Sequence, residues 1–226
     1  MATTAIITVF KVLFREIFRD NSENCSKKCL MEIISPQQLE KLRTDHHLKV
    51  TLIDHQMEFF TTWGLFSPRV IDEGSRLLLE VTKVNIDDHI LDLGCGYGPL
   101  GLTLAKQAQD GSTLLVDKDF VAVDYSNKNI QLNQLKNTHA MLSNGFDQIR
   151  ERKFDLIVSN IPAKVGNEML WLFLHDAYRQ LNPGGRLVVV TISGLSKFMK
   201  REFKQLFGNY KKLKQGKTYT VAQTIR

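Results

Sequence analysis

Residues 89–101 have the sequence HILDLGCGYGPLG, which is the strongest indication of the fold in this chain. The run from His89 to Leu93 is short and mostly apolar, as in a buried strand. Glycines at alternate positions then follow, beginning at Gly94, and they allow the backbone to approach a ligand closely. Pro99 opens a helical pattern, because the first turn of a helix does not need the missing N–H of proline. The order of strand, glycine loop and helix predicts the first βα unit of a doubly wound α/β fold.

The alternation of strand and helix continues toward the C-terminus. The pattern predicts helices over 120–132 and 167–181, a turn over 182–185, and further strands over 112–116, 140–143, 154–159 and 186–191. Strands near 209–213 and 218–223 are predicted to form an antiparallel hairpin. The fold class is therefore α/β and Rossmann-like, with a doubly wound, seven-stranded sheet that ends in this hairpin.

Two classes of ligand fit the glycine loop at this point. Gly96-x-Gly98-x-x-Gly101 matches the dinucleotide fingerprint, with the acidic residue Asp117 at the end of the second strand. The longer series Asp92-x-Gly94-x-Gly96-x-Gly98 instead suits a ligand without a pyrophosphate, in which a carboxylate helps to hold an ammonium group and the glycines leave room for a ribose. S-adenosylmethionine is such a ligand. In either case the ligand is expected beyond the carboxyl ends of the strands, where four residues should converge: Gly94, Asp117, Asn144 and Asn160.

The first part of the chain differs from the rest. Residues 5–18 have an amphipathic helical pattern and residues 21–28 form a polar connector, so we divide the chain into an N-terminal segment, 1–35, and a domain, 36–226. Between residues 36 and 82 the sequence predicts a helix, an extended stretch and a helix that begins near Val70. The aromatic segment 61–68, which contains Phe66, is predicted to be an ordered loop that could cover a pocket.

Composition places the chain among globular proteins. Of its 226 residues, 43% are hydrophobic and 24% are charged, which excludes disordered and collagen-like chains. Three cysteines are too few for a disulfide framework, and their spacing predicts no metal site. No run approaches the roughly 18 apolar residues that a membrane-spanning helix needs. A cytoplasmic protein without a membrane span is the expectation.

The net charge of +6 is concentrated in one segment. Residues 193–217 contain eight basic residues and a single acid, Glu202, whereas the rest of the chain is nearly neutral. Such a segment is typical of a surface that binds nucleic-acid phosphates. A solvated face on the last helix and hairpin is the alternative, and the sequence leaves both open.

Four motifs together resemble the "methyltransferase small" family of class I S-adenosylmethionine-dependent methyltransferases. They are DLGCGYGPLG at 92–101, GLFS at 64–67, DEGS at 72–75 and NIPAKVG at 160–166. Within that family the chain is most similar to bacterial guanine-N2 methyltransferases of small-subunit ribosomal RNA, over about residues 55–226. The resemblance implies S-adenosylmethionine as cofactor and RNA, ribosomal RNA in particular, as substrate.

The resemblance also implies roles for individual residues. Gly94, Gly96 and the backbone around Tyr97 would line the methionine and ribose parts of the cofactor. Asp117 would bind the ribose hydroxyls, and Asn144 would lie at the adenine edge. The complete predicted cofactor set is Asp92, Gly94, Gly96, Tyr97, Gly98, Asp117, Asn144 and Phe66.

The predicted catalytic residues are Asn160, Ile161 and Pro162. The family normally has Asn-Pro-Pro here, and the Asn side-chain oxygen and the next carbonyl accept hydrogen bonds from a planar amino group. Ile161 keeps that carbonyl but loses the fixed φ of proline, which predicts weaker pre-organisation. Ala163 lacks the ring that stacks on the target base in many relatives, and Lys164 is expected to meet RNA phosphates.

Three functions remain open on the sequence. The first is methyl transfer to an exocyclic amine of RNA, with guanine N2 of ribosomal RNA as the target. The second is the same chemistry on a protein glutamine or on adenine N6. The third is a module that binds cofactor or RNA without turnover.

The sequence makes no prediction of oligomeric state. Among other residues, Asp155 is expected to be structural, and Trp171 and Phe173 to lie in the core.

Overall fold

The computed structural model describes residues 44–226, and within them residues 46–61 and 65–226 form one compact unit. The predicted N-terminal helix, the polar connector and the helix expected from residue 36 lie outside the described residues. The division at residue 35 therefore stays a prediction. Among residues 44–226, no helix combines the length and the apolar character that crossing a bilayer requires.

The elements alternate as expected from residue 89 onward. The strands are β1 (His46–Leu52), β2 (His55–Thr61), β3 (His89–Leu93), β4 (Ser112–Asp117), β5 (Thr138–Leu142), β6 (Phe154–Asn160), β7 (Leu181–Ile192), β8 (Lys211–Gln215) and β9 (Tyr219–Ile225). The helices are α3 (Glu73–Val81), α4 (Pro99–Ala105), α5 (Phe120–Leu132), α6 (Asn167–Gln180) and α7 (Ser196–Phe207), with short 3-10 turns η1 (Asp147–Ile149) and η2 (Ser193–Leu195).

Strands β3 to β9 form one sheet in the order β5-β4-β3-β6-β7-β9-β8. Neighbours from β5 to β7 are parallel, whereas β9 is antiparallel to β7 and to β8. The Rossmann-like, seven-stranded sheet with its C-terminal hairpin is thus confirmed. The turn predicted at 182–185 is wrong as a boundary, because these residues lie inside β7. They form an irregularity in its pairing with β6, with Gly184 in the left-handed region at φ 80°.

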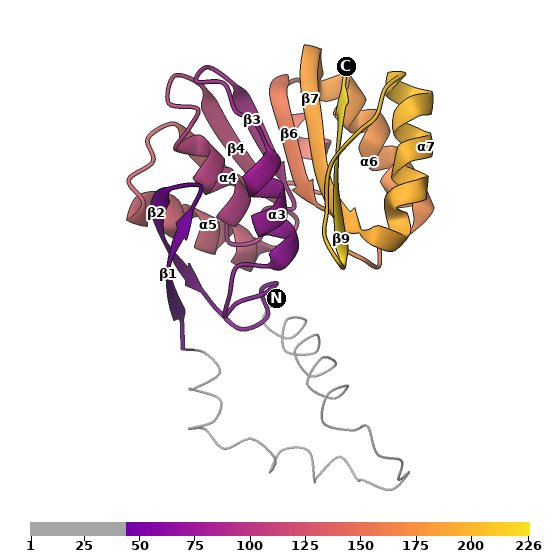
Figure 1. Ribbon diagram of the computed structural model, residues 1–226. Coiled ribbons are helices and arrows are strands. Elements are labelled where there is room, and N and C mark those ends of the chain that lie inside the picture. The colour runs from indigo at the N-terminus through magenta and orange to yellow at the C-terminus, as the bar shows by residue number, and fades with distance from the viewer. Residues whose placement is uncertain (1–43) are drawn as a thin grey trace, which may run out of the picture. The chain divides into compact units, whose positions relative to one another are not determined.

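Two apolar layers hold the helices against the sheet. On one face α3, α4 and α5 pack through residues such as Leu78, Leu102 and Ile130. On the other face α6 and α7 pack through Leu174 and Phe203. Figure 1 shows this arrangement, with the sheet between the two sets of helices. Trp171 on α6 is not in the core, contrary to expectation, because 46% of its surface is exposed.

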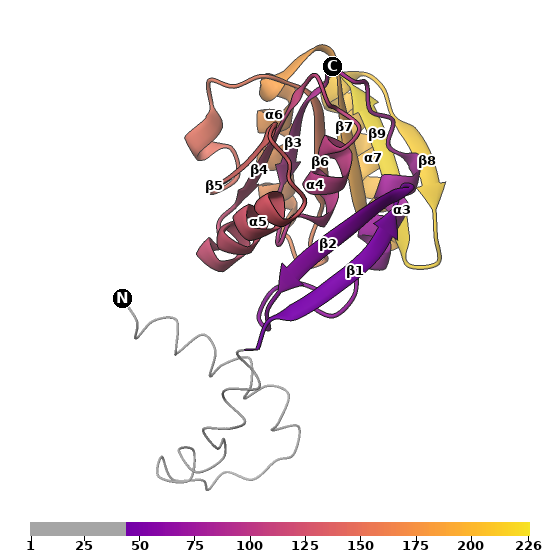
Figure 2. The same cartoon turned by 90° about the vertical axis from the view of Figure 1, so that its left-hand side faces the viewer.

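The extended stretch predicted between residues 36 and 82 is a β-hairpin, β1–β2. Ile53 and Asp54 both have positive φ, which matches a tight two-residue turn. The hairpin lies on the α5 side of the sheet (Figure 2), where two asparagines one turn apart pair with the edge of β2. Asn129 accepts from Phe60 N at 2.7 Å and donates to Phe60 O at 2.9 Å, and Asn133 does the same at residue 58. A helix thereby satisfies a strand edge that would otherwise be unpaired.

The chain reverses its direction of sheet growth between β3 and β6. Strands β4 and β5 extend the sheet on one side of β3, and β6 and β7 extend it on the other. In open α/β sheets this topological switch point is where the carboxyl ends of the strands leave room for a ligand. The fold therefore places the candidate site above β3 and β6.

Candidate active site

The register of β3 and β6 brings the glycine loop beside the Asn160 motif. Asp92 pairs with Val158 in the parallel ladder, so Gly94 and Asn160, each two residues further on, lie at the same edge. The Ser159 hydroxyl donates to the carbonyl of Leu93 at 2.7 Å and joins the two strand ends. The structure thus brings these two predicted site residues together at the switch point.

The other two predicted strand-end residues lie at the same carboxyl edge. Asp117 is the last residue of β4 and pairs with Leu142 at the end of β5. The amide of Ser143 donates to the carbonyl of Asp117 at 2.9 Å, and the exposed Asn144 follows directly. All four residues expected to converge therefore lie at the carboxyl edge of the sheet, in the spatial order Asn144, Asp117, Gly94 and Asn160, and a shared crevice stays a prediction.

The glycines of the loop divide into two kinds. Gly94 and Gly96 have φ of 74° and 58°, and a side chain added to either would meet no heavy atom within 4 Å. Gly98 is different, because an added Cβ would lie 2.5 Å from Leu102 and 3.1 Å from Leu115. Gly94 and Gly96 thus face open space at the edge of the sheet, whereas Gly98 is required for packing of α4 against β4.

Two carboxylates hold the glycine loop. Asp117 accepts hydrogen bonds from Gly96 N at 2.9 Å and from Asp119 N at 3.0 Å. Asp92 is fully buried and accepts from Gly101 N at 2.7 Å, while its second oxygen has no hydrogen-bond partner. Burial raises the pKa of Asp92 from its ordinary value of 3.8 to about 7, and the nearby Asp117 charge adds to this.

These features fit the cofactor that the sequence predicts. An orphaned oxygen on a buried carboxylate needs a donor, which a ligand ammonium group can provide. The Asp117 carboxylate has room for more donors, since two oxygens accept up to about four hydrogen bonds. Gly94 and Gly96, which border the open space, lie between Asp92 and Asp117 in the sequence. The assignment of single contacts to Asp92, Asp117 and Asn144 remains a prediction.

Tyr97 contributes to the site indirectly. Its side chain is buried, and its hydroxyl donates to Ser67 O at 3.2 Å and to Val70 O at 3.5 Å, which fixes the loop before α3. Burial raises the pKa of the Tyr97 phenol, so the hydroxyl remains a donor. Phe66, next to Ser67, is 66% exposed. The predicted loop is thus ordered and leaves one large aromatic ring uncovered.

Ile161 is anchored in a way that proline would not allow. Its N–H donates to Val190 O at 3.0 Å, and its side chain is only 5% exposed. Proline lacks that N–H, so the fixed φ that the family's proline provides is replaced here by a hydrogen bond and by burial. Pro162, Ala163 and Lys164 are exposed, as expected for residues that would face a substrate.

Sequence reasoning missed three residues around Asn160. Its amide nitrogen donates to Asp72 Oδ2 at 2.7 Å and to Ser75 Oγ at 3.0 Å, and the hydroxyl of Tyr219 donates to Asp72 Oδ1 at 3.3 Å. Asp72 also accepts from Ser75 N at 3.0 Å and caps α3. The Asp-x-x-Ser spacing in the DEGS motif signals that helix cap. No local pattern indicates the contact with Asn160 or with Tyr219.

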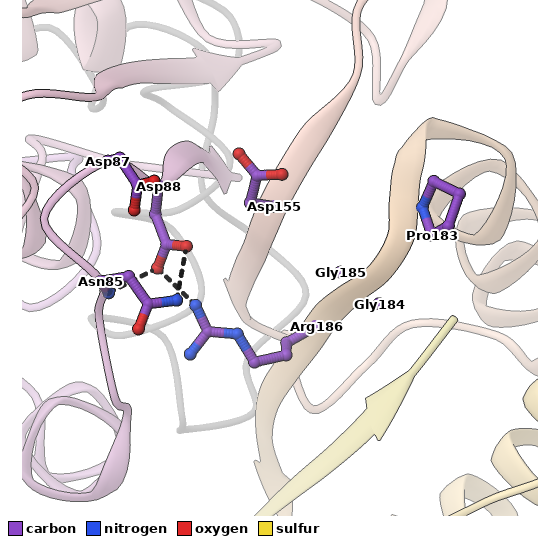
Figure 3. A pocket seen from close by; sticks show the side chains of 8 residues that line it. All are labelled: Asn85, Asp87, Asp88, Asp155, Pro183, Gly184, Gly185 and Arg186. Atoms are coloured by element: carbon purple, nitrogen blue, oxygen red, sulfur yellow. Dashed lines mark hydrogen bonds and ion pairs between the residues drawn. The ribbon is translucent and has the colours of Figure 1, made fainter.

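A separate cavity lies at the opposite, amino end of the strands. It has a volume of about 280 Å³ and lies between the loop before β3 and the irregular start of β7. Figure 3 shows Asn85, Asp88 and Arg186 turned toward one another there, and Arg186 forms an ion pair with Asp88. Asp155 accepts from His89 N and from Asn182 Nδ2, which agrees with its expected structural role. Because these polar groups satisfy each other, we assign this cavity to the fold. The described residues contain no cluster of metal-ligating side chains.

Comparison with known proteins gives a consistent result. The chain is 31% identical over 170 residues to the ribosomal RNA large subunit methyltransferase G of Yersinia pestis strain Pestoides F, covering 72% of this chain and 42% of that protein. The same protein of Yersinia enterocolitica gives the same identity and coverage. The chain thus spans less than half the length of these curated relatives.

Solved structures agree with the fold. The T. thermophilus 16S rRNA N2 G1207 methyltransferase RsmC, determined with AdoMet and guanosine, superposes with a TM-score of 0.73 and 28% identity, over 80% of this chain and 50% of that one. M. jannaschii TYW2, determined with AdoMet, has 16% identity and a TM-score of 0.59 over 81% of this chain and 85% of its own, and supports the fold alone. The family model of the methyltransferase small domain matches residues 56–223. The chain therefore belongs to the methyltransferase small domain family.

Proposed function

We propose that this chain transfers the methyl group of S-adenosylmethionine to an exocyclic amino group of RNA, with guanine N2 of ribosomal RNA as its target. The observation that carries the proposal is the juxtaposition of the open glycine loop and Asn160 at the switch point of the sheet. Of the two ligand classes that the glycine loop left open, membership of the family favours S-adenosylmethionine. Bound at the loop, this cofactor would supply an electrophilic methyl group.

The chain's own residues have defined tasks in this reaction. The oxygen of Asn160 and the carbonyl of Ile161 accept the hydrogens of the planar amino group and align its nitrogen with the methyl carbon. Such alignment supplies much of the rate of a transfer between two bound reactants. A strong general base is not needed, because the nitrogen becomes acidic once it is methylated and releases its proton to solvent.

The relatives support guanine N2 of ribosomal RNA as the target. The T. thermophilus structure that contains guanosine is of a guanine-N2 enzyme, and the Yersinia proteins are named for methylation of ribosomal RNA. Neither points to a protein glutamine. The buried and hydrogen-bonded Ile161 also argues against a module without turnover, because the backbone of the motif is held in place.

Part of the basic segment 193–217 lies at the same edge of the sheet as Asn160. Ser193 N donates to Thr218 O at 2.8 Å, so Lys197 after β7 and Lys217 before β9 both lie near the carboxyl ends of the strands. Lys164 follows the Asn160 motif there. All three are exposed, and no ion pair within residues 44–226 engages them. By contrast, Lys211 begins β8 at the opposite edge, and Lys214 pairs with Glu80. We assign Lys164, Lys197 and Lys217 to phosphate contacts.

The test is methylation of transcribed 16S and 23S ribosomal RNA with labelled S-adenosylmethionine, followed by mass spectrometry of the nucleosides. We expect N2-methylguanosine, and its loss in Asn160→Ala with cofactor binding intact by calorimetry. Replacing the three lysines by glutamate should weaken RNA binding and reduce its dependence on salt, whereas Lys211→Glu should have little effect. Label in adenosine, in protein or in no product would refute the assignment.

A further inference from the structure

The direction of the Asn160 side-chain amide is determined by its surroundings. An amide nitrogen has two hydrogens, and here one is donated to Asp72 Oδ2 and the other to Ser75 Oγ. An ionised carboxylate accepts and cannot donate, so the nitrogen of Asn160 must face Asp72. A rotated amide would place two acceptor oxygens against each other at about the 2.7 Å separation of this contact.

Asp72 is itself held in place from several sides. It accepts from the backbone of Ser75 and from the hydroxyl of Tyr219, in addition to Asn160. Burial, and then the charge of Asp72, raise the pKa of Tyr219, so this phenol stays protonated and donates. Gly74 allows the close packing, because an added Cβ would lie 2.9 Å from Asp72 Oδ2 and 3.2 Å from the ring of Tyr219.

We propose that Asp72 is a positioning residue that sets the hydrogen-bonding polarity of the active site. With both amide hydrogens engaged by Asp72 and Ser75, Asn160 has only its carbonyl oxygen left for a substrate. The site therefore accepts hydrogen-bond donors, such as an exocyclic amino group, and disfavours carbonyl oxygens. On a nucleobase this polarity selects the edge that carries the amino group. The inference rests on the proposed function. It means that Asp72, a residue outside the Asn-x-Pro motif, determines which chemical group of the substrate the site accepts.

The variant Asp72→Ser separates this role from helix capping. Ser75 N and the amide nitrogen of Asn160 both donate to the same oxygen of Asp72, Oδ2. Serine is about as good an N-cap as Asp, so α3 keeps its cap when the new hydroxyl oxygen accepts from Ser75 N. A hydroxyl also donates, so it no longer excludes the rotated amide, and the NH₂ group of Asn160 can then face the substrate.

The first measurement is spectroscopic and does not need a substrate. In proton–nitrogen correlation spectra of the full-length protein, the side-chain amide pair of Asn160 is identified by its disappearance in Asn160→Asp. We expect Asp72→Ser to shift this pair and to speed its exchange with solvent, because the bonds to a carboxylate are stronger than those to a neutral hydroxyl. Ser75→Ala, which removes one neutral partner, should change it less. Resonances of Asn160 that are unchanged in Asp72→Ser would overturn the proposal.

The second measurement is kinetic, with transcribed ribosomal RNA as substrate. Asp72→Ser should lower kcat by at least about tenfold, because Asn160 no longer presents its oxygen alone to the substrate, while the Kd for S-adenosylmethionine stays unchanged. The double variant Asp72→Ser with Asn160→Asp should recover most of this loss, because a carboxylate at position 160 offers an oxygen to the substrate in either orientation.

The outcomes separate this proposal from the proposed function. If the wild type methylates RNA and Asp72→Ser retains kcat within about threefold, the positioning role is refuted although the enzyme assignment stands. A double variant no better than Asp72→Ser would likewise contradict the polarity argument. If the wild type methylates no RNA, the proposed function fails, and the Asn160 resonances alone decide whether Asp72 orients the amide.

Discussion

Replacing Ile161 by proline, the residue usual in the family, should destabilise this protein. The N–H of Ile161 donates to Val190 O at 3.0 Å, and its side chain is 5% exposed. Loss of the donor leaves a strand carbonyl without this partner, at a cost of about 1–3 kcal/mol. The smaller ring also loses the equivalent of one or two buried methylene groups, about 1 kcal/mol in total. The free energy of unfolding should therefore fall by about 3 kcal/mol.

Urea unfolding followed by circular dichroism measures this loss. With a slope of about 3 kcal/mol per molar urea, the midpoint should move by about 1 M. The matched control is Ile161→Val, which keeps the N–H and should cost only about 1 kcal/mol. Methyl transfer to RNA, measured in parallel, should decrease in Ile161→Pro and persist in Ile161→Val. An Ile161→Pro variant that is as stable as wild type and more active would show that the bond to Val190 does not replace the proline.

Three further predictions concern the glycine loop and its supports. Burial raises the pKa of Asp92 to about 7, so the folded state holds a proton that the unfolded chain releases near 3.8. The stability that this proton provides in acid should be lost as the pH rises through 7, by a few kcal/mol, and Asp92→Asn should flatten the profile in urea titrations between about pH 5 and pH 8. Gly96→Ala should weaken cofactor binding in calorimetry, because the added Cβ enters the open space over the loop. The control is Gly184→Ala at the other end of the sheet, which also places alanine at a positive φ and should leave cofactor binding unchanged. Asn129→Ala removes the hydrogen-bond partner of both backbone groups of Phe60, and should lower the free energy of unfolding by about 3 kcal/mol and speed hydrogen exchange at the Phe60 amide. Slow exchange at that amide in the variant would show that β2 is held by other contacts.

Much of the fold and part of the site follow from local patterns. The glycine loop after β3 and the alternation of strands and helices are short-range features, because positive φ and side-chain periodicity depend on neighbouring residues. Parallel strands share one carboxyl edge, so Asp117 and Asn160 could be placed together before any contact was seen. The predicted boundaries failed mainly at Gly184, where an irregular segment stays paired within β7.

Other features depended on elements that meet only in three dimensions. Tyr219 contacts Asp72 across 147 residues of sequence, and Asn129 pairs with Phe60 across 69. Trp171 has the spacing of a core residue but is exposed, since no second layer covers that side of α6 among the described residues.

The fold class, the glycine loop and the residues at the strand ends were predictable from the amino-acid sequence, because each follows from backbone preference or from parallel topology. The direction of the Asn160 amide and the way in which Ile161 is fixed without proline became visible only in the folded protein. Both depend on hydrogen bonds to α3 and β7, and the packing that brings these elements to β6 leaves no periodic trace in the sequence.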